Sequence, residues 1–348
     1  MSVPQNPYKS QPKKAFWRPA VAERHFVDIE DLWQPLELKK EHKVATAGSC
    51  FAQHIGNNLA RRGATFMDME PAPPLFKSEA EARRWGFGVF SCRYGNIYTT
   101  RQLVQLFDEA FGDRTPIERV WENKGRFFDA LRPSIDPVGQ DSAESVLALR
   151  ELHLAKVRKM FQELDLFVFT LGLTEGWESV EDGTMFPMAP GTLAGSYDPE
   201  KYRFHNLRHS EVLADMKGMR ERLKAVNAGA RILLTVSPVP LTATATDGHV
   251  LPAGVYSKSV LRGVAGETAE DFENVTYFPS YEIISSHPSC GVFFNPDQRT
   301  VNQFGVDHVM THFFSGQLAE EFRMCSIPDE DNSLNLICDE ERLEDAQK

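Results

Sequence analysis

Two largely apolar runs constrain the fold of this chain more than any other feature of its sequence. They read Leu-Phe-Val-Phe-Thr-Leu at residues 166–171 and Arg-Ile-Leu-Leu-Thr-Val at residues 231–236. Strands that are apolar on both faces are typical of a sheet covered on both sides. A segment with helical periodicity precedes each run. The sequence therefore predicts a three-layer α/β/α fold with a mostly parallel central sheet.

The other periodic segments complete an alternation of strands and helices. Further strands are predicted at residues 43–46 and 275–278, and helices after Ser49 to about residue 62 and at residues 100–111, 147–161, 210–226, 257–274 and 301–323. In such a sheet the chemistry is expected at the carboxyl ends of the strands. The predicted ends are Ser49, the turn at residues 172–177 and the loop after Ser237.

We divide the chain into three parts. Residues 1–40 contain prolines and aromatic residues that include Phe16, Trp17 and Trp33, which suggests an arm packed on the body. Residues 41–325 form the predicted domain, in which residues 113–142 are interpreted as an insertion. Residues 326–348 are interpreted as an acidic flexible tail, because residues 329–348 hold eight acids against two basic residues and show no apolar periodicity.

Composition narrows the classes of partner. Much of the net charge of −11 lies in the tail, so the body lacks the basic surface that nucleic acids or anionic membranes require. No apolar run is long enough to span a membrane, and no secretory signal follows the N-terminal lysines. The five cysteines form no C-x-x-C pair, and no nucleotide or metal motif is present. We expect a cytoplasmic protein that needs neither metal nor cofactor.

Ser49 is the residue to which we assign the chemistry. A Gly-Ser-Cys-Phe sequence between a strand and a helix places the Ser49 hydroxyl where free backbone N–H groups can stabilise an oxyanion. Two other interpretations stay open: Ser49 caps the helix, as serine often does, or Cys50 is the nucleophile. Cys50 is expected to point into the core instead.

Several ordered segments carry a resemblance to a known family. Gly48–Ala52 spells Gly-Ser-Cys-Phe-Ala, and Tyr-Gly-Asn-Ile-Tyr at 94–98, Gly-Leu-Thr-Glu at 172–175, Ser-Pro-Val at 237–239, Ser-Lys at 257–258 and Tyr-Phe-Pro-Ser-Tyr-Glu at 277–282 follow in order. Together they resemble the bacterial GSCFA family, which is similar to the SGNH (GDSL-like) esterases and acyltransferases. The resemblance implies an SGNH hydrolase-like fold over roughly residues 43–315.

The resemblance also implies roles for particular residues. Ser49 matches the SGNH nucleophile, and Gly95 matches the glycine of the oxyanion hole. The third SGNH block is Gly-x-Asn-Asp, whereas this chain has Gly-Leu-Thr-Glu, so that only Asn96 or Thr174 can replace the oxyanion-hole asparagine. Glu175 is a candidate catalytic carboxylate with a structural role as the alternative. Lys258 is a candidate cation for an anionic substrate.

The general base is where this chain departs furthest from the SGNH pattern. The expected Asp-x-x-His is replaced by Asp-Gln-Arg-Thr at residues 297–300. His249 and His287 are the histidines nearest to predicted strand ends. We favour His287, held by Glu282, Asp297 or a backbone carbonyl, because it precedes the region from which SGNH enzymes supply their histidine.

These expectations define one hypothesis and one rival. The first is a serine-dependent ester hydrolase or O-acyltransferase, whose partner is a small-molecule or glycan acyl ester and whose substrate is an acylated carbohydrate by analogy with the family. The rival is a catalytically silent module that binds a glycan or an acyl group on the same fold. The oligomeric state is not predictable from these patterns.

Overall fold

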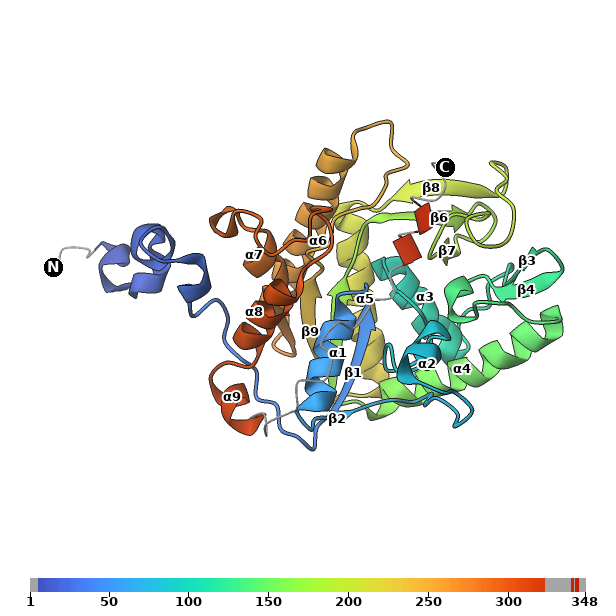
Figure 1. Ribbon diagram of the computed structural model, residues 1–348, viewed down its shortest axis with the longest axis horizontal. Coiled ribbons are helices and arrows are strands. Elements are labelled where there is room, and N and C mark those ends of the chain that lie inside the picture. The colour runs from blue at the N-terminus through green and yellow to red at the C-terminus, as the bar shows by residue number, and fades with distance from the viewer. Residues whose placement is uncertain (1–5, 323–338, 341, 344–348) are drawn as a thin grey trace.

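The central sheet confirms the predicted architecture. The structure, a computed structural model, describes residues 6–322, 339, 340, 342 and 343 of the chain (Figure 1). Five parallel strands lie in the order β10-β9-β5-β1-β2, with bounds β1 Lys43–Gly48, β2 Thr65–Phe66, β5 Leu166–Leu171, β9 Arg231–Val236 and β10 Val275–Phe278. The strands predicted at 166–171, 231–236 and 275–278 have the predicted bounds.

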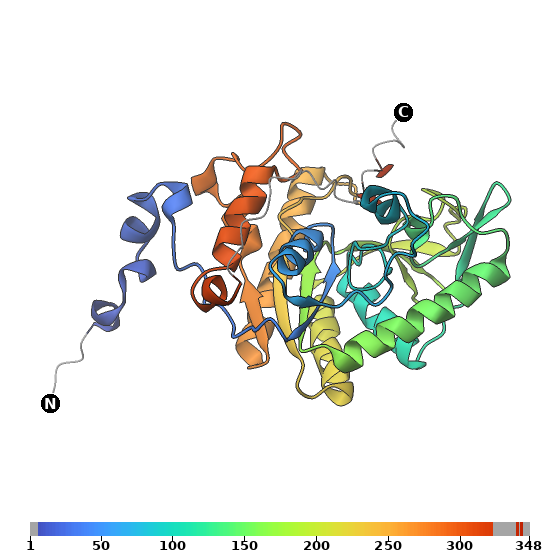
Figure 2. The same ribbon diagram turned by 60° about the horizontal axis from the view of Figure 1, so that its bottom comes forward.

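Helices cover both faces of this sheet. Apolar side chains of α3 Thr100–Phe111, α4 Ala143–Glu163, α5 His209–Val226 and α6 Val250–Asp271 form one cluster with it. Those of α1 Ala52–Arg61, α7 Ser280–Ser285 and α8 Gln303–Phe313 form the other, and Figures 1 and 2 show α1 and α8 on the side away from α3 and α4. In β5, Phe167 belongs to the first cluster and Val168 to the second. The fold is therefore a three-layer α/β/α structure.

Two predicted helices have different bounds in the structure. The helix predicted from residue 257 begins at Val250, and its first seven residues were missed because they include Pro252 and Gly254, which have low helix propensity. The helix predicted over residues 301–323 is interrupted: α8 ends at Phe313, and α9 spans Gln317–Glu321. Gly316 lies between them with a φ of 54°, which a continuous helix does not allow.

Small additional sheets lie around the carboxyl ends of the central strands. One contains β6 Glu175–Ser179 between β7 Met185–Phe186 and β8 Tyr202–Asn206, and the other is the β3 Val120–Asn123 and β4 Arg126–Asp129 hairpin within residues 113–142. A short helix, α2 Glu79–Arg84, follows β2. Figure 1 shows β6 and β8 beside residues 339, 340, 342 and 343 of the C-terminal segment.

The N-terminal arm contacts the body through aromatic residues near its end. Trp33 packs on Phe278 and Phe313, and its indole N–H donates to the His312 carbonyl oxygen at 2.7 Å. Residues 7–22 form short helical turns farther out (Figure 1). Most of the predicted 326–348 tail lies outside the described residues. In the part of the chain that the structure describes, no helix combines the length and apolarity required to cross a bilayer.

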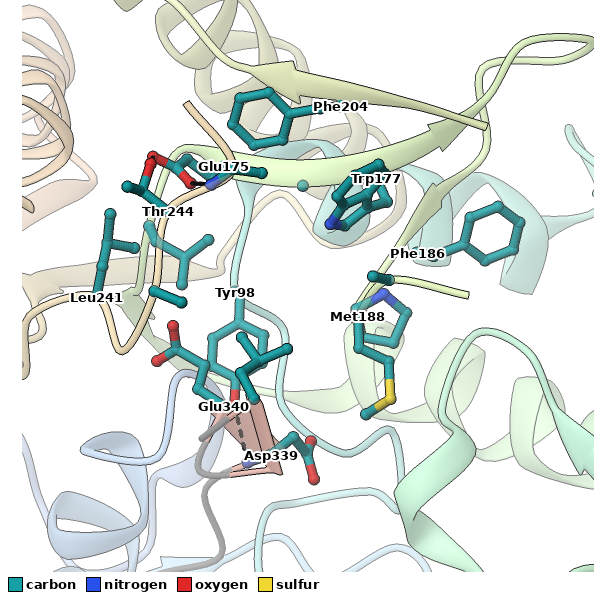
Figure 3. Close-up of a pocket in the computed structure, with 17 residues that line it drawn as sticks. Tyr98, Glu175, Trp177, Phe186, Met188, Phe204, Leu241, Thr244, Asp339 and Glu340 are labelled. Carbon is teal, nitrogen blue, oxygen red and sulfur yellow. Dashed lines mark hydrogen bonds between the residues drawn. The ribbon is translucent and has the colours of Figure 1, made fainter. Parts of the chain in front are cut away.

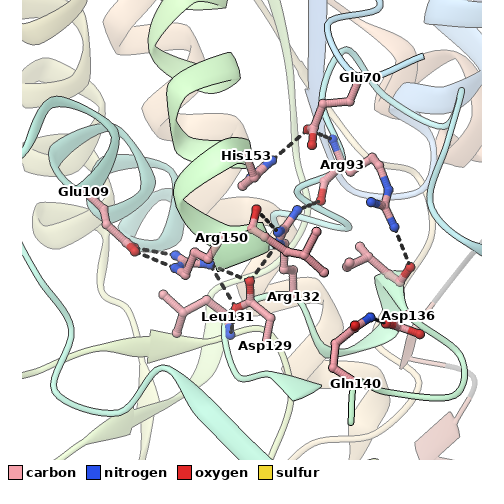
Figure 4. A network of polar contacts seen from close by, with 12 residues as sticks. Glu70, Arg93, Glu109, Asp129, Leu131, Arg132, Asp136, Gln140, Arg150 and His153 are labelled. Atoms are coloured by element: carbon pink, nitrogen blue, oxygen red, sulfur yellow. Dashed lines mark hydrogen bonds and ion pairs between the residues drawn. The ribbon is translucent and has the colours of Figure 1, made fainter. Parts of the chain in front are cut away.

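A buried ionic network joins the β3–β4 insertion to the helical layer (Figure 4). Arg150 of α4 is 1% exposed and binds both Glu109 of α3 and Asp129 of β4. Arg132 donates to the same Asp129 carboxylate at 2.7 Å. Burial alone would raise the pKa of Asp129, but Arg150 and Arg132 lower it to about 2. The network therefore keeps the Asp129 carboxylate charged inside the protein.

Replacing Arg150 with methionine should lower the free energy of unfolding by about 3–5 kcal/mol, because two carboxylates would lose their buried cation. Urea denaturation measures this change. Lys159→Met on the same helix is the matched control, since Lys159 pairs with Glu163 in an exposed i,i+4 geometry, and it should cost no more than about 0.5 kcal/mol. Equal losses in the two variants would contradict the buried network.

Candidate active site

Ser49 lies in the turn between β1 and α1. It is 3% exposed, and within the described residues its hydroxyl has no hydrogen-bond partner. The residue that caps α1 is Phe51, which makes no side-chain cap hydrogen bond, and Ser49 contributes only its carbonyl oxygen, which accepts from Ala52 N–H at 2.9 Å. The hydroxyl therefore does not cap the helix, and as a buried polar group without a protein partner among the described residues it is available to a ligand or a water molecule.

Gly48 brings the Ser49 turn against the neighbouring strand. Its φ is 126°, a conformation that side chains rarely permit, and a Cβ atom at this position would lie 2.2 Å from the Thr170 carbonyl oxygen. The Ser49 N–H donates to that same oxygen at 3.1 Å. The backbone N–H of Ser49, which we expected to face an oxyanion, is therefore already bonded to β5.

The turn after β5 connects Ser49 to Lys258. A Cβ atom at Gly172 would lie 3.2 Å from Ser49 Cβ, so the two residues are in direct contact. The Lys258 ammonium group, on a residue only 4% exposed, donates to the Gly172 carbonyl oxygen at 2.6 Å. Ser257 accepts a hydrogen bond from Thr174 N–H at 2.9 Å. The Ser-Lys pair of α6 thus holds the turn and brings a positive charge near Ser49.

Residues 95–97 form a third side of the site. Gly95 adopts a φ of 71°, and Ile97 N–H donates to the Gly48 carbonyl oxygen at 2.9 Å, which fixes this loop to the end of β1. The Asn96 side chain is 3% exposed, and its amide nitrogen donates to the Asp339 carboxylate at 2.9 Å. The structure therefore places Asn96 on the loop bonded to the Ser49 turn, with an acid against its amide.

Thr174 and Glu175 continue from the same turn into β6. The Thr174 hydroxyl donates to the Asn206 side-chain oxygen at 2.7 Å. The Glu175 carboxylate accepts from the Thr244 hydroxyl at 2.7 Å and from Ala245 N–H at 3.3 Å, and burial raises its pKa. Thr174 is thus bonded to the end of β8 and Glu175 to the loop after β9, and Glu175 also lines the cavity described below.

The two histidines predicted as bases contact other groups. His287 is exposed and stacks on Trp17 of the N-terminal arm, with ring centroids 5.5 Å apart. His249 is exposed and caps α6, where its Nδ1 accepts from Leu251 N–H at 3.1 Å. Glu282, expected to hold His287, instead accepts from Tyr277 and Arg262. The described contacts join neither histidine to the Ser49 turn.

Three charged residues of this region were missed from the sequence. Arg299 lies in the stretch compared with the fifth SGNH block, and its guanidinium group contacts the Glu340 carboxylate at 3.1 Å, with the two side chains 10% and 13% exposed. Asp297 folds the turn that presents Arg299, by accepting from its N–H at 2.9 Å. Asp339 and Glu340 were assigned to a flexible tail. The position of Arg299 within residues 297–300 could have identified it as a site residue, whereas no sequence pattern pointed to Asp339 or Glu340.

A cavity of about 180 Å³ opens beside these residues. Figure 3 shows Tyr98, Asp339 and Glu340 on one side and Trp177 and Met188 on another. Its lining is mainly apolar, and Leu173, one residue beyond the Gly172 turn, forms part of the wall. Such a lining, with a few convergent polar groups, is typical of small-molecule sites.

Comparison with known families gives one match. The model of the GSCFA family matches residues 43–313. That range includes the Ser49 turn, the Gly172 turn, Lys258 and Arg299, and it leaves the acids at 339 and 340 outside. No curated protein matches the chain.

Proposed function

The chain belongs to the GSCFA family, and on this premise we propose that it is a serine-dependent ester hydrolase or O-acyltransferase with an SGNH-like arrangement. The buried Ser49 hydroxyl, which has no partner among the described residues, carries this proposal. It lies at the carboxyl end of a parallel strand, where α/β proteins place their ligands. The α/β/α fold and the family match, which includes Ser49, support this proposal.

The proposed reaction begins with transfer of the Ser49 proton to a base. The Ser49 oxygen then bonds to the acyl carbon. Collapse of the tetrahedral intermediate breaks the ester C–O bond, and the leaving oxygen takes the proton back from the base and departs as the alcohol. Water or an acceptor hydroxyl later removes the acyl group from Ser49. Because Ser49 N–H is bonded to Thr170, the Asn96 amide and Gly95 N–H are the proposed oxyanion donors.

Lys258 supplies the positive charge in this proposal. Its ammonium group holds the residue that contacts Ser49, in a buried environment where charge interactions are stronger than in water. The charge would favour both the Ser49 alkoxide and the oxyanion that follows. His287 and His249 would have to change their present contacts to act as bases.

An acylated carbohydrate is the proposed substrate. The cavity wall carries aromatic side chains of Tyr98, Trp177 and Phe204, which offer flat apolar faces to a sugar ring or an acyl group. Glu175 and Thr244 provide polar groups at one side (Figure 3). We place the protein in the cytoplasm, a reducing compartment, in keeping with the buried Cys50 and Cys92, neither of which forms a disulfide among the described residues.

A silent binding module is the second candidate. The hydrogen bond from Ser49 N–H to Thr170 favours it, since one expected oxyanion donor is engaged. In that case the cavity would hold a glycan or an acyl group without turnover.

A serine-directed fluorophosphonate distinguishes the two functions. We expect one adduct per chain, located at Ser49 by peptide mass spectrometry. Lys258→Arg should retain much of the labelling rate because it keeps the charge, whereas Lys258→Met should lower the rate about 100-fold, in line with the loss of one electrostatic group at a reacting oxyanion.

The controls separate reactivity from folding. Each variant is checked by circular dichroism, since Lys258 also holds the Gly172 turn. Folded wild-type protein that takes up no label supports the binding module. Equal labelling of Lys258→Met and wild type would remove Lys258 from the mechanism.

A further inference from the structure

The C-terminal segment reaches into the candidate site through Asp339. This residue is 4% exposed, and its carboxylate accepts from the Asn96 amide at 2.9 Å. Its backbone N–H donates to the Tyr98 hydroxyl at 3.0 Å (Figure 3). The Asp339 carboxylate thus accepts a hydrogen bond from the Asn96 side-chain amide, the group that we propose as an oxyanion donor.

Glu340, the next residue, meets the cations of the site. Its carboxylate contacts Arg299 at 3.1 Å and is also attracted by the Lys258 charge. Arg299 follows β10 in the chain, and Lys258 comes from α6, so the carboxylate contacts one cation and lies in the field of a second from a separate element. The position of the Glu340 carboxylate is therefore electrostatically suited to a negatively charged group.

We propose that Arg299 and Lys258 form a subsite for a carboxylate group of the substrate, and that the C-terminal segment is a tethered competitor in which Glu340 occupies this subsite while Asp339 engages the Asn96 oxyanion donor. The inference deepens the proposed function and rests on it for the identity of the site. The ligand class follows from the occupant of the subsite, since Glu340 is a carboxylate in contact with a guanidinium group. A uronic acid or a similarly acidic sugar combines this group with the sugar ring proposed for the cavity.

The energetics of the docked segment allow exchange. Burial raises the pKa of both Asp339 and Glu340 despite their hydrogen-bonding and charged partners. Docking therefore costs these acids part of their hydration. A free carboxylate that gains the same contacts and also fills the apolar cavity can replace them.

Calorimetric titration of the full chain with glucuronate tests the subsite. If the segment is docked at least nine-tenths of the time, the Asp339→Asn/Glu340→Gln variant should bind glucuronate about tenfold more tightly than wild type or better, since the competent fraction divides the dissociation constant. Adding Arg299→Gln should remove the gain. Asp113→Asn/Glu200→Gln, which removes two exposed acids elsewhere, is the control for net charge and should bind like wild type.

Glucose and inorganic phosphate serve as comparison ligands. Equal affinity of wild type and the Asp339/Glu340 variant for glucuronate would overturn the competitor. Binding of glucose as tightly as glucuronate, or of phosphate in its place, would overturn the carboxylate class.

A second measurement covers the case in which the double variant does not fold. Glucuronate added to wild-type protein should speed hydrogen exchange at the Asp339 amide, which loses its bond to Tyr98, and unchanged exchange at saturation would contradict the proposal.

Fluorophosphonate labelling keeps the two proposals apart. If the Asp339→Asn/Glu340→Gln variant binds glucuronate more tightly but Ser49 is not labelled, the subsite proposal stands and the proposed reaction is rejected. A Ser49 adduct without the gain in affinity does the reverse.

Discussion

Replacing Ser49 with alanine should lower hydrolysis of a short aryl ester by at least about a thousandfold, as loss of a nucleophile does in other serine enzymes. The free energy of unfolding should not fall, because the hydroxyl has no partner within the described residues and does not cap α1. Removing an unpaired buried polar group is neutral or stabilising. Initial rates and urea denaturation of the same preparations measure both effects.

Ser280 offers a matched control for this variant. It is also buried and also follows a central strand, but its hydroxyl bonds to Thr235 and to the Val236 carbonyl oxygen. Ser280→Ala should therefore cost about 1 kcal/mol of stability and leave turnover within a factor of two. Wild-type turnover by Ser49→Ala would remove Ser49 from the chemistry.

Gly48→Ala should be among the most destabilising single substitutions in the protein. The added Cβ would lie 2.2 Å from the Thr170 carbonyl oxygen. Gly48 and Thr170 are paired residues of the adjacent strands β1 and β5 within the central sheet. Relief requires the strands to separate or the φ of 126° to change. We expect a loss of more than about 4 kcal/mol, the range reserved for core disruption and severe strain.

Gly63→Ala is the control that separates backbone strain at a positive φ from steric collision of the added Cβ. Gly63 also has a positive φ, 80°, but nothing lies within 4 Å of its Cβ position, so this variant should cost only about 1 kcal/mol. Urea denaturation of the two variants gives the comparison. Similar losses would mean that β1 and β5 are not in close contact at Gly48. In a folded Gly48→Ala variant, fluorophosphonate labelling should also fall, since Ser49 would be displaced.

The sequence was informative where local pattern and burial coincide. The apolar runs of β5 and β9 identified their strands to the residue, because strands buried on both faces carry apolar side chains at most positions rather than at alternate ones. The strand-turn-helix pattern located Ser49 at a strand end. Short strands such as β2 and β7 were missed, since two-residue strands carry no periodicity.

The sequence by itself thus determined the layers of the fold, the family and the position of Ser49, all of which follow from local patterns. Tertiary structure alone decided which charged groups meet at the site: Lys258 against the Gly172 turn, Arg299 against Glu340, and Asp339 against Asn96, a residue 243 positions earlier in the chain. It also decided that His249 and His287 contact α6 and Trp17. The reason is physical, because hydrogen bonds and ion pairs between distant segments depend on how the layers pack, and single-residue patterns do not record that packing.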